Sequence, residues 1–316
     1  MDIVHFRQMI KPWMLPIAMV TGMIFHSEIE SVQFLAPYLI FVMLLITFCK
    51  VDPKELKFGH MSWVLLAVQL LGGVGLYFAL RPLSPVLAEG AFICVFCPTA
   101  TAAPVITGML GGSVVKVAMY SIVSNVAVAL TAPALFEYMG GESLGDAVGF
   151  VKGFTTICLK VGPLIILPLI TAFVLRYAAP KVHHSIASHQ SLSFYIWAVS
   201  LLIVVGKSVS FVMSEPQHMI PVMSAIAGAA LVVCVLQFII GRRIGRRFGD
   251  RVAGAQGLAQ KNTVLAIWMS LNFLDPISSV GPASYILWQN TINSAQIYFK
   301  TRKDTKNFNG RVLLII

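Results

Sequence analysis

Residues 96–112 read FCPTATAAPVITGMLGG, and residues 254–273 read GAQGLAQKNTVLAIWMSLNF. Both stretches are mostly apolar, but neither suits an uninterrupted helix. In the first, Pro98 and Pro104 each remove a backbone donor and disfavour helix at the preceding residue. In the second, the apolar run is broken by polar side chains at positions 260–263. We therefore predict that both stretches are interrupted helices inside a membrane.

The composition of the whole chain supports a membrane setting. Of its 316 residues, 57% are hydrophobic and only 11% are charged, and the mean hydropathy is +0.82. Soluble domains carry about 25% charged residues. Such a composition is tolerated in lipid, where most side chains can face hydrocarbon. The first apolar run lacks a small-residue cleavage site, so we expect it to be retained as a first span.

Counting apolar runs of about 20 residues, the length that crosses a ~30 Å hydrocarbon core, predicts ten spans. They lie near residues 7–26, 31–49, 61–80, 86–110, 114–138, 149–177, 191–213, 219–240, 252–273 and 277–299. With the N-terminus inside, eighteen Lys and Arg residues fall in inner segments, Arg81 alone falls in an outer loop, and four lie within spans. This asymmetry predicts a multi-pass plasma membrane protein with both termini cytoplasmic. The net charge of +10 therefore does not indicate nucleic-acid binding.

Ten spans divide into two halves of five. Pro16 in the first span and Pro168 in the sixth are about half the chain length apart, and the fourth span of each half is the interrupted one. An odd number of spans per half inverts the second half relative to the first, as in many secondary transporters. We predict one inverted repeat over 1–146, a second over 147–300 and a cytoplasmic tail over 301–316.

Broken helices at corresponding positions of two repeats indicate where a transporter binds its substrate. Freed backbone groups and polar side chains there would line a cavity, because lipid cannot satisfy them. The alternative is a pair of proline kinks with polar packing. The substrate-binding residues predicted from the two breaks are Thr99, Thr101, Gln260, Lys261, Asn262 and Thr263.

These segments resemble the bile acid:sodium symporter family. CPTATAAPV at 97–105 resembles the family's CPGGTASNV, and QGLAQKNTVLA at 256–266 resembles its ExGMQNSGLA. The segment GPASYILWQNTINSA at 281–295 resembles its last helix, where Asn290 falls in a WHN-like triplet. The resemblance covers essentially the whole chain. It implies an all-α fold of ten helices in two inverted halves with crossed, broken helices four and nine, and adds Asn290 to the substrate-binding set.

The resemblance also implies how this chain departs from sodium coupling. Ligand positions of the family's first sodium site fall on Ala103, Pro104 and Val117, which offer no side-chain oxygen. The carboxylate shared by both sites falls on Gln256, so a bound cation would lack a counter-charge. The oxygen-bearing matches that remain are Ser121, Gln260 and Gln69. Sodium is therefore a doubtful partner, with a residual site at Gln69 and Gln260 as the alternative.

Lys261 stands where the family has Asn. Ten residues at about 1.5 Å each place it about 15 Å from Arg251, near the middle of the membrane. An intramembrane lysine is by default a functional hypothesis, although it could merely face a wet cavity. Lys160 and Lys207 also lie within spans, where no acid neutralises them. We expect an organic anion as substrate and Lys261 as the ion-coupling residue with Gln256, Gln260, Gln69 and Ser121. Desolvation disfavours a charged lysine, so proton coupling and uncoupled transport both stay open.

Other classes of membrane protein fit less well. An intramembrane enzyme needs a nucleophile with a base, or metal ligands, and mid-membrane His, Asp and Glu are missing. We therefore expect no catalytic residue, no bound metal and no cofactor. A passive channel is the main alternative to a carrier. Substrate identity, transport direction and oligomeric state stay open.

Overall fold

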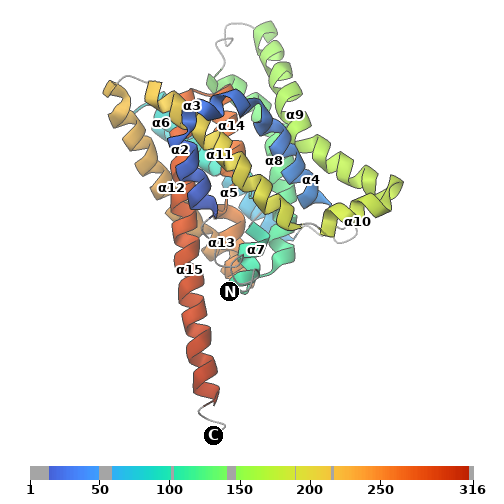
Figure 1. Cartoon of the computed structure of the whole chain (residues 1–316). Helices are drawn as coiled ribbons and strands as arrows, with labels where there is room; N and C mark the ends of the chain where they lie inside the picture. Colours follow the sequence, from blue (N-terminus) through green and yellow to red (C-terminus); the bar gives the residue numbers. More distant parts are fainter. Residues whose placement is uncertain are drawn as a thin grey trace.

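The computed structural model describes residues 14–49, 59–100, 103–140, 147–188, 190–214 and 217–312, and they form an all-helical fold (Figure 1). The α-helices in these ranges are α2 (Met14–Ile24), α3 (His26–Ile29), α4 (Ala36–Phe48), α5 (His60–Leu80), α6 (Pro85–Phe96), α7 (Ala103–Met109), α8 (Val114–Gly140), α9 (Ala147–Ala178), α10 (Pro180–Ser188), α11 (Gln190–Ser214), α12 (Ile220–Arg247), α13 (Arg251–Ala259), α14 (Thr263–Phe273) and α15 (Val280–Val312). Short 3-10 helices are η1 (Glu30–Leu35), η3 (Gln217–Met219) and η4 (Pro276–Ser279).

Each apolar run predicted as a span coincides with one helix or with an interrupted pair of helices. Three helical stretches of the described chain, His60–Leu80, Val114–Met139 and Gln217–Arg247, are long and apolar enough to cross a membrane. Residues 7–13 of the first predicted span lie outside the described residues. Helix α15 continues to Val312, so the predicted boundary at 300 between last span and tail falls inside one continuous helix.

Several helices turn large apolar side chains outward. Leu71 on α5 is 73% exposed and Val232 on α12 is 58% exposed. Leu130 on α8 and Leu167 on α9 are exposed as well. Continuous apolar surface of this kind is uncommon on soluble monomers but suits contact with lipid.

The helices form two groups that meet around the interrupted pairs. Helices α2 and α4 pack on α11, and α4 also packs on α9, which makes one group. Helices α5, α6, α12, α13 and α15 pack on one another in the other group. In Figure 1, α11 runs diagonally across the front with α2 and α4 beside it, and α12 and α15 lie on the left. The rings of Phe92, Phe96 and Phe136 contact one another within the main buried core.

The closest helix contact joins α12 to α13 and depends on three glycines. Gly241 and Gly245 lie four residues apart on α12, the small-xxx-small spacing that lets helix backbones approach in membranes. Gly254 on α13 faces them. A Cβ at Gly254 would meet the carbonyl oxygen of Gly241 and come within 2.6 Å of the Cα of Gly245. Backbone atoms cannot move aside as a flexible side chain can, so this contact tolerates only glycine.

Gly254→Ala is therefore expected to destabilise the protein by about 1–3 kcal/mol, the usual cost of overpacking. The matched control is Gly228→Ala on α12, where an added Cβ meets nothing within 4 Å. Replacing glycine by alanine in an open helix position stabilises it by up to about 1 kcal/mol. Thermal unfolding in detergent should show a midpoint several degrees lower for Gly254→Ala only. Equal midpoints for the two variants would contradict the close contact.

Candidate functional site

The two interrupted helices meet at their breaks. Helix α6 ends at Phe96 and α7 begins at Ala103, while α13 ends at Ala259 and α14 begins at Thr263. Between them the two extended segments run antiparallel and form a β-bridge between Thr99 and Lys261. The backbone N–H of Ala100 donates to the carbonyl of Gln260, and that of Asn262 donates to the carbonyl of Pro98, both at 2.8 Å. The sequence segments predicted to form one site are thus in direct contact, in a crossover of residues 97–100 and 260–262.

Local sequence explains why the helices stop there. Pro98 disfavours helix at Cys97, which ends α6. Helix α13 begins at the side chain of Asp250, which accepts a hydrogen bond from the N–H of Ala253. Helix α14 begins at Asn262, whose side chain accepts from the N–H of Leu265. Side chains of this type, one residue before a helix, satisfy N–H groups that have no intrahelical partner.

Lys261 is placed at the C-terminal end of α6. Its side chain is only 1% exposed, and Nζ donates a 2.7 Å hydrogen bond to the carbonyl of Val95. The last carbonyls of a helix have no intrahelical partner and carry about half a negative charge. Within the described ranges, no carboxylate forms an ion pair with Lys261. A cation at this position neutralises a helix end.

Gln69 on α5 covers the next carbonyls of α6. Its Nε2 donates to the carbonyls of Phe96 (2.7 Å) and Cys97 (3.1 Å). Its Oε1 accepts from the hydroxyls of Tyr120 (2.6 Å) and Ser124 (2.9 Å). Both lone pairs of this oxygen are therefore in use. In this conformation Gln69 has no lone pair left for the residual sodium site that we predicted for it.

A second glutamine and tyrosine form a related pair in the other half of the chain. Nε2 of Gln237 on α12 donates to the carbonyl of Cys94 (3.1 Å) and to the hydroxyl of Tyr285 (2.9 Å). That hydroxyl donates to the carbonyl of Ala259, the last residue of α13 (2.8 Å). Each glutamine–tyrosine pair thus caps the carbonyl end of an interrupted helix.

Thr99, a predicted substrate ligand, is instead occupied by the protein. Its hydroxyl donates to the carbonyl of Gly257 at 2.7 Å, and its carbonyl accepts from the hydroxyl of Ser121 at 3.2 Å. Its N–H donates to Ser124 Oγ at 3.2 Å. Thr99 and Ser121 therefore hold the crossover together in this conformation. Thr101, its predicted companion, lies outside the described residues.

Gln256 and Gln260 are joined through Asn293 on α15. Gln256 Nε2 donates to Asn293 Oδ1 at 2.9 Å, and Asn293 Nδ2 donates to Gln260 Oε1. Both glutamines are fully buried. The carboxamide at 256 therefore stands where the resemblance places a carboxylate, and it is held by an amide rather than by a cation.

Four polar atoms around this network are buried without a hydrogen-bond partner in the described structure. They are Gln256 Oε1, Gln260 Nε2, Asn262 Nδ2 and Thr263 Oγ1. Buried polar groups are normally paired, so unpaired ones indicate an absent ligand or a conformation that changes. Three of the four can donate a hydrogen bond. These three donors lie at or next to the N-terminal end of α14, where the helix dipole also favours negative charge.

On the last helix, the residue that contacts the crossover is Gln289, the neighbour of the predicted ligand Asn290. Gln289 Oε1 accepts from the N–H of Lys261 at 3.0 Å, and its Nε2 donates to the carbonyl of Lys261 at 3.4 Å. Tyr285, Gln289 and Asn293 are spaced four residues apart, so they share one face of α15. That polar stripe was the signal in the sequence that could have identified them.

Within the described residues, no three His, Cys, Asp or Glu side chains are grouped so that they could hold a metal ion. The groups that meet at the crossover are amides, hydroxyls, one ammonium and the thiol of Cys97, which donates to the carbonyl of Asn262. They can hold an anion by hydrogen bonds and charge. The chain matches no family model, and it shows no significant similarity to the curated proteins with which it was compared.

Proposed function

We propose that this protein is a secondary carrier that moves a small organic anion across a membrane by alternating access. The observation that carries the proposal is the set of unpaired donors on Gln260, Asn262 and Thr263 at the start of α14. They are buried beside Lys261, whose ammonium donates to the carbonyl of Val95 and, within the described part of the chain, pairs with no carboxylate. An anionic oxygen is the ligand that this set of groups lacks.

The arrangement of helices supports an inverted repeat of the bile acid:sodium symporter type. In each half the fourth span is interrupted, and α5 packs on α6 as α12 packs on α13. Helix α2 packs on α11 as α9 packs on α4. The pairs Gln69–Tyr120 and Gln237–Tyr285 come from corresponding helices of the two halves. We propose ten spans with both termini on the cytoplasmic side.

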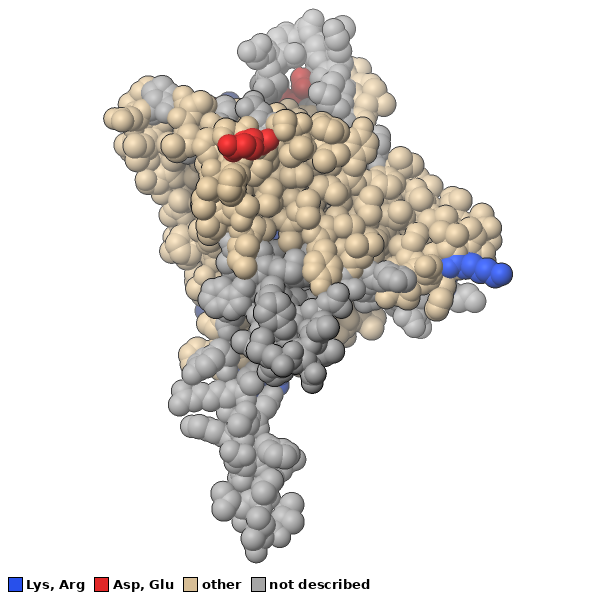
Figure 2. Space-filling model, viewed as in Figure 1, with Lys and Arg blue, Asp and Glu red and all other residues tan. Residues whose placement is uncertain are grey.

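Charge distribution supports that orientation. Figure 2 shows acidic side chains toward the end of the molecule where α3 lies and basic ones toward the end where α10 lies. Four arginines at the end of α12, Arg242, Arg243, Arg246 and Arg247, are exposed. Basic residues gather on the cytoplasmic side of membrane proteins. The α10 end is therefore the cytoplasmic end in our proposal.

We further propose that Lys261 takes the place of a bound sodium ion. It lies against the carbonyl end of α6, where a cation is favoured, and Gln256 removes the carboxylate that a sodium ion would need. A fixed ammonium requires no ion gradient to be present. Transport would then be uncoupled from sodium, and the lysine itself is the group able to exchange a proton.

The test is uptake into proteoliposomes from a panel of labelled carboxylates and sulfonates. A carrier gives saturable uptake that is accelerated when the same unlabelled anion is loaded inside, whereas a channel shows no such stimulation. Thr263→Val removes an unpaired donor and should raise the half-saturating concentration roughly threefold to tenfold, the effect of one hydrogen bond. Thr155→Val is the control, because that exposed hydroxyl bonds within its own helix. Uptake that is linear in concentration and indifferent to internal anion would refute the proposal.

A further inference from the structure

A separate cavity lies away from the crossover. It has a volume of about 220 Å³ and is bounded by the η1–α4 segment, α11 and α14. Its α14 wall includes Trp268, five residues after Thr263 where α14 begins, so it starts about 7–8 Å along α14. One water occupies about 30 Å³ of liquid, so the cavity has room for a solute about the size of seven waters. It is therefore large enough for a small molecule.

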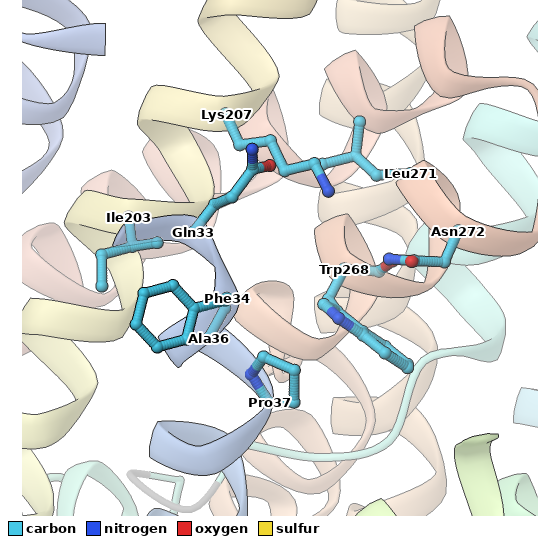
Figure 3. A pocket seen from close by; sticks show the side chains of 9 residues that line it. All are labelled: Gln33, Phe34, Ala36, Pro37, Ile203, Lys207, Trp268, Leu271 and Asn272. Carbon is cyan, nitrogen blue, oxygen red and sulfur yellow. The ribbon is translucent and has the colours of Figure 1, made fainter. Parts of the chain in front are cut away.

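The polar side chains that line this cavity make it cationic. Among the described lining residues, Lys207 on α11 is the ionisable one, accompanied by the amides of Gln33 and Asn272. Figure 3 shows the Lys207 side chain extending from α11 toward the face of α14 that carries Leu271 and Asn272. Lys207 is half-buried, and no carboxylate of the described chain pairs with it. A partly desolvated ammonium without a counter-charge favours an anion beside it.

The rest of the lining is apolar and partly aromatic. The rings of Phe34 and Trp268 form opposite sides of the cavity beneath Lys207 in Figure 3. The amide nitrogen of Asn272 donates one of its two hydrogens to the carbonyl of Trp268, and Lys207 and Gln33 add further donors to the lining. One cationic end and an aromatic body fit a monovalent anion with a short apolar or aromatic group.

The cavity also lies between the first helix group and α14. Gln33, Phe34 and Lys207 belong to the group of α2, α4, α9 and α11, whereas Trp268 and Asn272 belong to α14, the second half of an interrupted helix. A solute held there touches both that group and α14, so its binding is sensitive to their relative position. A ligand can shift such an equilibrium only by binding its states differently.

We propose that this cavity is a second binding site for the transported anion, in which Lys207 pairs with its carboxylate or sulfonate. The inference rests on the proposed carrier function. It assigns the anion a position on the α14 side of the crossover, toward the end of the molecule that we propose to be extracellular. The solute would bind Lys207 before it reaches Lys261.

Benzoate is a suitable probe, because it combines one carboxylate with one ring, and benzyl alcohol has the same ring without charge. Calorimetric titration of the full-length protein in detergent should show that benzoate binds wild type. Binding should weaken at least tenfold in Lys207→Met, which removes the charge and keeps the chain length. Lys207→Arg should retain most of the affinity. Benzyl alcohol should bind weakly and equally to all three.

Two further variants separate charge from folding. Gln33→Glu places a carboxylate beside Lys207 without removing the lysine, and should also weaken benzoate binding at least tenfold. Lys181→Met is the matched control, since that lysine is exposed on α10; it should bind benzoate as wild type does. Thermal unfolding without ligand reports whether each variant is folded.

The outcomes distinguish this site from the carrier function. Benzoate binding that is absent in wild type, or unchanged in both Lys207→Met and Gln33→Glu, overturns the site. If saturable, trans-stimulated uptake persists in that case, the carrier function stands alone. If benzoate binds through Lys207 but no anion of the panel is taken up, the site stands and the carrier function fails.

Discussion

Lys261→Met is expected to reduce anion uptake by more than tenfold while the protein stays folded. The substitution leaves the carbonyl of Val95 without its donor, which costs about 1–3 kcal/mol. It also removes a buried ammonium whose desolvation costs several kcal/mol. Methionine matches lysine in length and lacks branching, so these opposing terms largely cancel in the free energy of unfolding.

For anion binding, by contrast, the loss of the Lys261 charge has no compensating gain. A unit charge about 8 Å from a bound anion contributes about 2 kcal/mol at an effective dielectric constant of about 20. That corresponds to roughly 30-fold in affinity. Without Lys261 the negative carbonyl end of α6 would face the anion with no cation between them. Uptake by Lys261→Met and by the control Lys181→Met, measured beside their thermal unfolding, checks this. Wild-type uptake by Lys261→Met would exclude a role for its charge.

The second large effect is a gain of sodium binding. Combining Gln256→Glu with Lys261→Asn restores the carboxylate that the resemblance implies and removes the cation that competes with sodium. The new carboxylate would lie beside the Asn293 Oδ1 that now bonds Gln256 and near Gln260 Oε1, so three oxygens would face one position. Hard cations prefer such ligands.

We expect the unfolding midpoint of this double variant to rise with sodium and not with choline. A ligand at one hundred times its dissociation constant stabilises the folded state by about 2.7 kcal/mol, which amounts to several degrees. The matched control is Gln256→Glu alone, in which Lys261 keeps its place and no sodium effect is expected. Stabilisation by sodium of the single variant equal to that of the double variant would show that Lys261 does not replace the ion.

The interrupted helices were the part of the fold that the sequence predicted best. Proline at 98 and 104, and a polar run at 260–263, have direct consequences for backbone donors, so their positions could be predicted without a structure. The helical runs were equally visible, since apolar length is what a membrane span requires. The continuation of α15 to Val312 was not, because residues after 300 are polar and give no apolar signal.

The sequence predicted which residues lie at the candidate site, but not which atoms contact one another there. Lys261, Gln260, Asn262 and Thr263 do lie at the crossover, as the breaks indicated. Which atoms satisfy one another depends on helices far apart in sequence, and no local pattern contains that information. The pairing of Lys261 with Gln289 rather than Asn290 depends on the rotation of α15 by a single residue.

The hydrogen bonds that Thr99 and Gln69 form within the protein could not be predicted from the sequence either. Thr99 was predicted to face a substrate because it lies in a helix break, and Gln69 was predicted as an ion ligand because of the family resemblance. Their partners are the carbonyls freed by the helix breaks themselves, together with hydroxyls on α8. A sequence shows that such carbonyls exist but not which side chain reaches them.

The most direct test of the account is the initial rate of anion uptake by wild-type protein in proteoliposomes, with external sodium replaced by choline at several pH values. If Lys261 stands in for the ion, the rate is the same in both salts at every pH. A rate that falls severalfold or more in choline would mean that sodium is still bound and coupled, and that Lys261 does not perform its role.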